Sequence, residues 1–186
     1  VRKLADEFGL AVAEKPDSQE ICFIGDEGYK WFIEKRIAAD FRPKGVIRTV
    51  EGVVVGEHDG LHRYTIGQRK GLQLTIPEPE LYYVVGFDTK TSALVVGVEA
   101  QLFSQDLVAS KVNWLRPIDS FHGLKCKAKI RSRSPEAACR VTLFENSMVH
   151  VEFDEPQRAV TPGQAVVFYD GDEILGGGFI DKIGQA

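Results

Sequence analysis

Cysteine is scarce in this sequence, which has three among 186 residues. The count is odd, there is no Cys-x-x-Cys pair, and no histidine stands at a spacing suited to zinc. Neither a disulfide framework nor a metal site is therefore indicated. Cys126 and Cys139 fall on the inward face of two predicted strands. Unpaired cysteines in such positions are usually small core residues, and we expect both to be inert.

Long apolar runs are absent too. No stretch reaches the about 18 consecutive apolar residues of a membrane-spanning helix. The amphipathic start VRKLADEFGL also lacks the apolar centre of a secretory signal. We therefore expect a soluble, cytoplasmic protein with no membrane partner. The net charge of −4 gives no overall indication of nucleic-acid binding, so a basic surface would have to be local.

The first 44 residues carry a helical pattern in two parts. Apolar residues recur at helical spacing over 1–9 and again over 29–39, and Pro43 disfavours helix at the residue before it. The first helix has neither a starting Met nor an N-cap residue. We therefore expect the chain to be a piece of a longer protein.

Between these helices, the stretch KPDSQEICFIG at 15–25 places Cys22 in a short apolar run bounded by turn-forming residues. A loop can carry a reactive thiol to a substrate while a scaffold holds the rest. The alternative is that Cys22 is a small buried apolar residue, as most unpaired cysteines are. These residues alone leave both interpretations open.

From Gly45 the apolar period changes from that of a helix to that of a strand. Short runs of β-branched and aromatic residues predict the hairpins of a small antiparallel sheet, with strands at 46–50, 53–55, 81–87 and 93–98. The stretch GEHDGLHRYTIGQRKG at 56–71 fits no strand period. Its glycines would let a ligand approach the backbone, and Arg69 and Lys70 offer cationic donors, but a solvated loop explains the pattern equally well.

The last third of the chain predicts a closed or nearly closed barrel, because short strands follow one another at regular spacing with glycine-rich corners. Asp170 and Gly171 form a hairpin-turn pair between two of them. The predicted strands are 107–115, 125–133, 137–144, 148–153, 165–169 and 174–180.

One of these strands, 125–133, alternates sharply between apolar and cationic residues. Its inward face carries Cys126, Ala128 and Ile130. Charged residues often protect a strand edge, but a row of five cations exceeds that need, so binding of RNA or another polyanion explains the pattern equally well. The outward face carries Lys125, Lys127, Lys129, Arg131 and Arg133.

Three long motifs now point to a family. DSQEICFIG, GEHDGLHRYTIGQRKGL and VTPGQAVVFYDGDEILGGGFI resemble, in this order, the C-terminal half of the bacterial tRNA-specific 2-thiouridylases, the MnmA or TrmU family. The family was formerly catalogued as a tRNA (5-methylaminomethyl-2-thiouridylate)-methyltransferase. The resemblance covers essentially the whole chain. It implies a mainly β protein: a helical remnant of a PP-loop catalytic domain at 1–44, a central antiparallel β domain at 45–103, and a barrel similar to those of elongation factors at 104–186.

The resemblance also implies an activity for the intact protein, that of a tRNA-uridine 2-sulfurtransferase. ATP adenylates the wobble uridine of tRNAs for Lys, Glu and Gln at its 2-oxygen, and a cysteine persulfide then delivers sulfur to the same carbon. Cys22 matches the cysteine that receives sulfur from a carrier protein. The phosphate loop SGGxDS is absent from this sequence. We therefore expect ATP to be bound by the missing domain, no cofactor in this chain, and no activity from the chain alone.

In the barrel, the resemblance implies tRNA contacts at Arg131 and Ser132, which align with an Arg-Tyr pair of the family, and at Gln164 in TPGQ. Serine at 132 departs from the family tyrosine and puts a stacking contact in doubt. With the cations noted above, the predicted tRNA-binding residues are Arg131, Ser132, Gln164, Lys127, Lys129, Arg133, Arg69 and Lys70.

Two other classes of function stay open. A stand-alone RNA-binding barrel without catalysis would have no reason to carry Cys22 and its flanks. A structural protein–protein adaptor would bind no tRNA at all.

Overall fold

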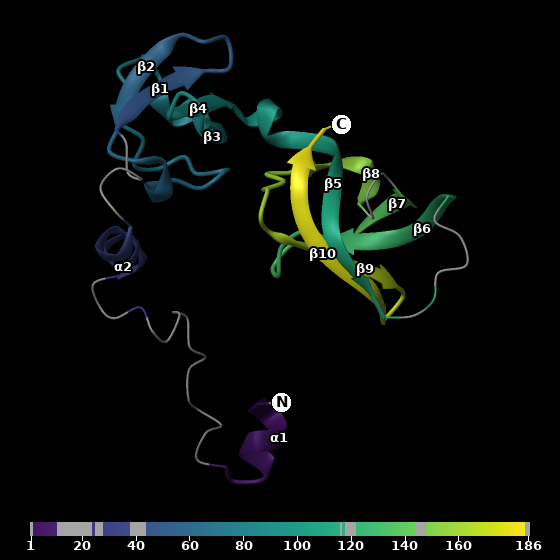
Figure 1. Cartoon of the computed structure of the whole chain (residues 1–186). Helices are drawn as coiled ribbons and strands as arrows, with labels where there is room; N and C mark the ends of the chain where they lie inside the picture. The colour runs from purple at the N-terminus through teal and green to yellow at the C-terminus, as the bar shows by residue number, and fades with distance from the viewer. Residues whose placement is uncertain are drawn as a thin grey trace. The chain divides into compact units, whose positions relative to one another are not determined.

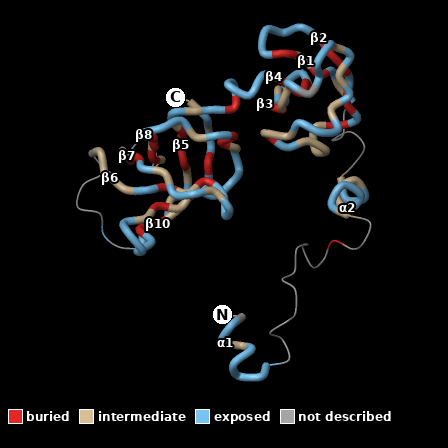
Figure 2. The backbone as a smooth tube through the Cα atoms, turned by 180° about the vertical axis from the view of Figure 1, so that it is seen from behind, coloured by how far each residue is buried: buried red, intermediate tan, exposed pale blue. Residues whose placement is uncertain are grey.

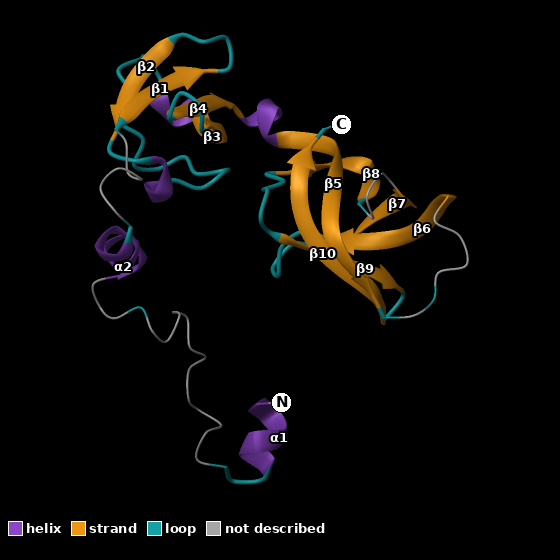
Figure 3. Ribbon diagram, viewed as in Figure 1, coloured by secondary structure: helices purple, strands orange, loops and turns teal. Residues whose placement is uncertain are grey.

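The computed structural model describes residues 2–10, 24, 28–37, 44–115, 117, 122–143 and 148–184. Figure 1 labels its helices and strands, and Figure 3 colours them by type. The chain divides into two units, 1–42 and 43–186. Within the described residues, no helix combines the length and the apolar character needed to cross a membrane.

The first unit contributes two short helices, α1 (Arg2–Glu7) and α2 (Gly28–Arg36), close to the positions predicted. In α2, cations stack on aromatic rings one turn earlier: the Lys35 ammonium lies 4.3 Å from the Trp31 ring centre, and the Arg36 guanidinium 3.5 Å from that of Phe32. Such pairs stabilise a helix locally. Cys22 lies outside the described residues.

The second unit begins with a four-stranded sheet, the central sheet, in the order β2-β1-β4-β3. β1 and β4 run parallel, with Ile47 opposite Leu94, so the sheet is mixed and the prediction of an antiparallel sheet is wrong in this pairing. Parallel neighbours need a crossover of about a dozen residues or more, and the connection between β2 and β3 supplies one. The strands are β1 (Gly45–Thr49), β2 (Val54–His58), β3 (Tyr82–Asp88) and β4 (Ala93–Val98).

The glycine-rich stretch at 56–71 is not simply a solvated loop. It starts as the end of β2, and Ile66 then inserts into the apolar cluster under the sheet, where it is only 6% exposed. The Gly67 amide donates to Val84 O at 2.8 Å, and the Val84 amide donates to Gln68 O at 2.8 Å. The segment therefore covers the buried face of the central sheet.

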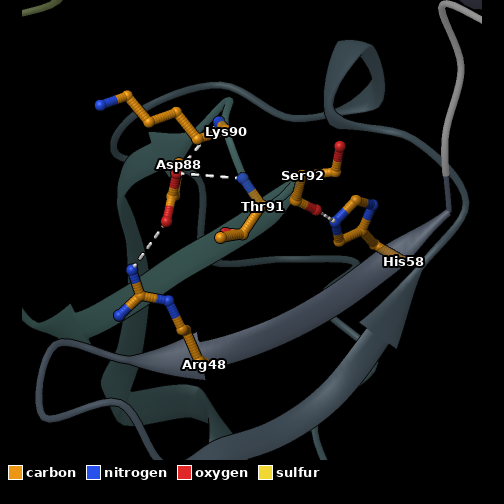
Figure 4. Close-up of polar contacts among 6 residues, drawn as sticks. All are labelled: Arg48, His58, Asp88, Lys90, Thr91 and Ser92. Carbon is orange, nitrogen blue, oxygen red and sulfur yellow. Dashed lines mark hydrogen bonds and ion pairs between the residues drawn. The ribbon is translucent and has the colours of Figure 1, made fainter.

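The turn between β3 and β4 is held by side chains from the other hairpin (Figure 4). The Asp88 carboxylate accepts the amides of Lys90 and Thr91 at 3.1 and 3.3 Å and pairs with the Arg48 guanidinium at 3.2 Å. His58 Nε2 lies 2.9 Å from Ser92 O, and its Nδ1 accepts the Gly60 amide at 3.0 Å. These contacts join the two hairpins of the central sheet.

The rest of the second unit is the closed barrel that the sequence predicts, in the order β10-β5-β8-β7-β6-β9, and all six of its strand pairings are antiparallel. Buried positions alternate along its strands (Figure 2). The two-residue turn after Asp170 is the expected hairpin. The strands are β5 (Phe103–Trp114), β6 (His122–Lys129), β7 (Ala137–Leu143), β8 (Val149–Arg158), β9 (Ala165–Asp170) and β10 (Glu173–Ile183).

The barrel core contains two stacked aromatic rings, Trp114 and Phe168, with centres 5.3 Å apart. The glycine run of β10 lets that strand lie close to β5, because a Cβ atom at Gly176 would lie 2.5 Å from Asn113 O and one at Gly178 would lie 2.7 Å from Ser110 O. No larger side chain fits at those two positions without a shift of the backbone.

One predicted strand is too long. β6 ends at Lys129, so Arg131 and Arg133 lie in the turn that follows and do not continue a row of five cations on one strand. The physical reason is local: the turn at 131–134 closes on itself through Ser134, and Pro135 comes next. Three outward lysines remain on the strand: Lys125, Lys127 and Lys129.

Candidate nucleic-acid interface

A hollow of about 460 Å³, the barrel groove, opens where β6 ends and β9 begins. It brings together four predicted tRNA-binding residues that come from separate segments. Because β6 and β9 pair directly, with Lys129 opposite Val167, outward side chains of both strands share one face. The groove is lined by Lys129, Ile130, Arg131, Ser132, Gln164, Ala165, Val167 and Tyr169.

The turn after β6 forms one wall of the groove. Arg131 O accepts the Ser134 amide at 3.1 Å and the Ser134 hydroxyl at 2.9 Å, while the Arg131 amide lies 3.2 Å from the same hydroxyl oxygen. This closure holds Ser132 and Arg133 at the exposed tip of the turn. A serine at the tip can offer a hydrogen bond to a ligand but no ring for stacking.

A second turn, Thr161-Pro162-Gly163-Gln164, forms the facing wall. The Gln164 amide donates to Thr161 O at 3.2 Å, and Gly163 has φ 84°, as a type II turn with proline second and glycine third requires. The Gly163 amide donates to Ile180 O at 2.8 Å, and Gln164 O accepts the Ile180 amide at 2.8 Å. The position of Gln164 is therefore fixed by the barrel itself.

Arg131 joins these walls. Its Nη2 donates to Ala159 O at 2.9 Å and to Thr161 Oγ1 at 3.0 Å, and lies 3.5 Å from Ile66 O in the segment that covers the central sheet. Nη2 carries two hydrogens, so the longest of these contacts is the weakest. The residue stays exposed at the groove. Arg131 thus fixes the shape of the groove as well as its charge.

The lysines of β6 do not protect a free edge, because β6 has a strand on each side in a closed barrel. Lys125 and Lys127 are exposed and Lys129 is half-buried. Glu136 lies 3.9 Å from the Lys127 ammonium, a distance at which an exposed ion pair contributes little. A cationic strip in the middle of a sheet is consistent with binding a polyanion.

Sequence reasoning missed two residues of this surface. Arg140 on β7 is exposed and stands opposite Lys125, and half-buried Tyr169 on β9 stands opposite Lys127. Alternation along β7 was the available signal for Arg140, since Cys139 points inward. The ring of Tyr169 offers a face on which a base can stack, which Ser132 does not.

Arg69 and Lys70 are not among the residues that line the barrel groove. They are exposed, in a segment held by Gln68, whose Oε1 accepts the Thr65 amide at 3.1 Å and whose Nε2 donates to Lys70 O at 2.9 Å. Their role in binding tRNA stays a prediction. So does the role of Cys22, which is outside the described part of the chain.

A second hollow, of about 320 Å³, lies at the end of the central sheet. Two of its charged groups already pair with each other: Lys44 Nζ lies 2.8 Å from Asp59 Oδ1, which raises the pKa of Lys44 and lowers the pKa of Asp59. His58 is buried and bonded on both ring nitrogens. We interpret these contacts as structural. Across the described residues, no group of histidine, cysteine and acidic side chains could hold a metal ion.

Family models match three consecutive segments of the chain. An aminomethyltransferase β-barrel domain matches 104–180, a tRNA methyl transferase PRC-barrel domain matches 30–98, and a tRNA methyl transferase HUP domain matches 1–26. The fold and these three matches define the class: a chain built from domains that the tRNA methyl transferase family models describe.

Curated relatives carry a more specific name, tRNA-specific 2-thiouridylase MnmA. The chain is 48% identical over 182 residues to that of Symbiobacterium thermophilum, 42% over 182 residues to that of Halothermothrix orenii, and 46% over 181 residues to that of Geobacter metallireducens. These alignments cover 97–98% of this chain and 46–50% of the relatives. The chain belongs to the MnmA family, and it spans about half the length of the curated relatives it matches.

Proposed function

We propose that the chain is the tRNA-binding part of a tRNA-uridine 2-sulfurtransferase. In the intact protein, ATP would activate the wobble uridine of tRNAs for Lys, Glu and Gln, and a persulfide would thiolate its C2. The proposed division is a remnant of the ATP-binding domain at 1–44, the central β domain at 45–103 and the tRNA-binding barrel at 104–186. The names of the curated relatives support this assignment.

The barrel groove is the observation on which the proposal rests. Arg131, Ser132 and Gln164 belong to two turns about thirty residues apart, and the fold sets both turns around one hollow beside Lys129. Cations fix the phosphate backbone, a glutamine amide can bond to a base or a ribose, and an aromatic ring can stack on a base. A surface with all of these suits a folded RNA better than a small anion.

Cys22 is the proposed sulfur carrier. A sulfur-carrier protein would leave a persulfide on Cys22, and its terminal sulfur would bond to C2 of the adenylated uridine while AMP leaves with the 2-oxygen. A second thiol, supplied by the rest of the protein, would then break the bond between the two sulfurs by forming a disulfide with Cys22. Replacing Cys22 by Ser in the intact protein should abolish 2-thiouridine formation and leave tRNA affinity unchanged.

Salt-dependent tRNA binding to this chain tests the groove. Because each neutralised phosphate releases counterions, log K should fall with log salt by about 0.7–0.9 per contact. Lys127→Ala with Lys129→Ala should weaken all tRNAs alike and flatten that slope. Lys3→Ala with Lys90→Ala, which removes two exposed cations outside the barrel, is the matched control and should do neither. An unchanged slope in the double variant would contradict the proposal.

A stand-alone RNA-binding module remains a second candidate, because the described part of the interface lies in the barrel and needs no catalysis. The two candidates predict the same salt dependence. They differ in the intact protein, where only the sulfurtransferase loses thiolation with Cys22→Ser. An adaptor, by contrast, predicts no tRNA binding by any variant.

A further inference from the structure

Two cysteines that the sequence led us to regard as inert lie side by side on neighbouring strands of the barrel. Cys126 on β6 and Cys139 on β7 are direct partners in the antiparallel register. Their Sγ atoms are 3.7 Å apart. A disulfide needs about 2.05 Å between sulfurs and a Cα separation that adjacent paired strands already provide. Rotation of the two side chains, with little movement of the backbone, would therefore bring the sulfurs to bonding distance.

The two thiols differ in access. Cys139 is 4% exposed and belongs to the barrel core, whereas Cys126 is half-buried and packs at the edge of that core. A small reagent from solvent can therefore reach Cys126 first. Cys139 is less accessible to solvent than Cys126.

The hydrogen bond between the thiols also shifts their pKa values in opposite directions. Like the difference in access, this shift makes Cys126 the more reactive thiol. The hydrogen bond with Cys139 lowers the pKa of Cys126, against the opposing effects of burial and of the nearby Asp170. The same bond, together with burial, raises the pKa of Cys139. A thiol that more readily becomes a thiolate is the better nucleophile. The more accessible sulfur is thus also the more reactive one.

We propose that Cys126 and Cys139 form a reversible thiol-oxidation site, with Cys126 as the attacking thiol and Cys139 as the resolving one. Attack of the Cys126 sulfur on a peroxide breaks the O–O bond, gives a sulfenic acid and releases one water. Attack of the Cys139 sulfur on that sulfenic acid forms the disulfide and releases a second water. The peroxide is reduced by two electrons, the two thiols are oxidised by two, and a dithiol reductant reverses the change.

This site is separate from the proposed function. Lys125 and Lys127, on either side of Cys126 in sequence, are exposed while Cys126 packs toward the core. A disulfide would link strands that are already paired. We therefore expect oxidation to leave tRNA affinity within a factor of about two, so a failure of either proposal does not decide the other.

The test uses this chain with Cys22→Ser, so that only the two barrel thiols remain. After exposure of the folded chain to hydrogen peroxide, the chain is unfolded in guanidinium chloride, free thiols are blocked with N-ethylmaleimide, and the intact mass is measured. The expected product has lost two hydrogens and carries no maleimide. Treatment with dithiothreitol after the peroxide and before the maleimide should restore two maleimide additions. Two additions after peroxide, or a product linked between chains on a non-reducing gel, would overturn the proposal.

Single variants test the order of attack. Cys139→Ser should stop at a sulfenic acid on Cys126, which dimedone captures. Cys126→Ser should leave Cys139 unmodified over the same exposure, because Cys139 is buried. Equal reaction of the two variants with peroxide would refute the assignment of roles even if a disulfide forms in the parent chain.

Discussion

The barrel and the central sheet bury their apolar residues in different ways. Among the described residues, the buried cluster of the barrel draws only on the strands and turns of the barrel. The cluster under the central sheet includes Ala159, which follows the barrel strand β8, is 1% exposed and donates its amide to Leu102 O at 2.8 Å. The sheet is open, with β2 and β3 at its edges, whereas the barrel is closed. The sheet therefore depends on the barrel for part of its core, and the barrel has no such need of the sheet.

Charged side chains follow the same division. In the central sheet they pair with each other: Asp88 with Arg48 beside the β3–β4 turn, and Lys44 with Asp59 where β1 begins and β2 ends. In the barrel they line the outside of β6 and the groove beside it. Similar residue types thus support the fold in one region and form a candidate binding surface in the other.

We expect the largest effects from truncating one core side chain in the barrel and one in the central sheet. Phe168→Ala removes a fully buried ring stacked on Trp114 and should cost about 3–5 kcal/mol of the free energy of unfolding. If the sheet depends on the barrel, this variant should lose amide protection in both regions by hydrogen exchange. Leu94→Ala, at an equally buried position in the sheet, should lose protection in the sheet alone.

Phe179→Ala is the control for the barrel variant, since Phe179 lies on β10 but is 52% exposed. Its effect on unfolding should stay within about 0.5 kcal/mol. Loss of barrel protection in Leu94→Ala would contradict the one-way dependence of the sheet on the barrel.

The second effect concerns the joint between the two regions. Arg131→Ala removes the donor to Ala159 O and Thr161 Oγ1 and the weaker contact with Ile66 O, and should cost about 1–3 kcal/mol. Urea unfolding measures the loss. Arg133→Ala removes the same charge from the exposed tip of the same turn and should cost less than about 0.5 kcal/mol. Equal losses would mean that the Arg131 contacts do not join the regions.

Local patterns predicted most elements of this fold but not the pairings between distant ones. The bounds of β4 match the predicted run 93–98, because alternation and flanking turn residues are local signals. The parallel pairing of β1 with β4 was missed, since no local pattern records which distant strands become neighbours. The end of β6 was missed because strand alternation continued past Lys129 into a turn closed by Ser134.

The candidate site shows the same limit. Sequence motifs named Arg131, Ser132 and Gln164 separately, and the fold sets them around one groove. The hydrogen bonds of Arg131 to Ala159 and Thr161 depend on how two turns meet, which alternation does not encode. Likewise, the inward placement of Cys126 and Cys139 was predicted correctly, but their pairing depends on the register of β6 with β7.

The smallest effect is a pH dependence in the central sheet. Hydrogen bonds from Thr91 and Lys90, and the contact with Arg48, lower the pKa of Asp88 below its usual value. A carboxylate with a lowered pKa stabilises the fold at pH values above its ordinary pKa, and this contribution is lost as pH falls through the lowered value. Asp88→Asn should therefore be slightly less stable than the parent at neutral pH, and the difference should vanish in acid. Thermal unfolding across that pH range measures the difference in stability. Asp172→Asn, in the β9–β10 turn of the barrel, is the control because it makes the same change of charge. A deficit in Asp88→Asn that persists in strong acid would show that the amide fails to replace the carboxylate for a reason other than its charge.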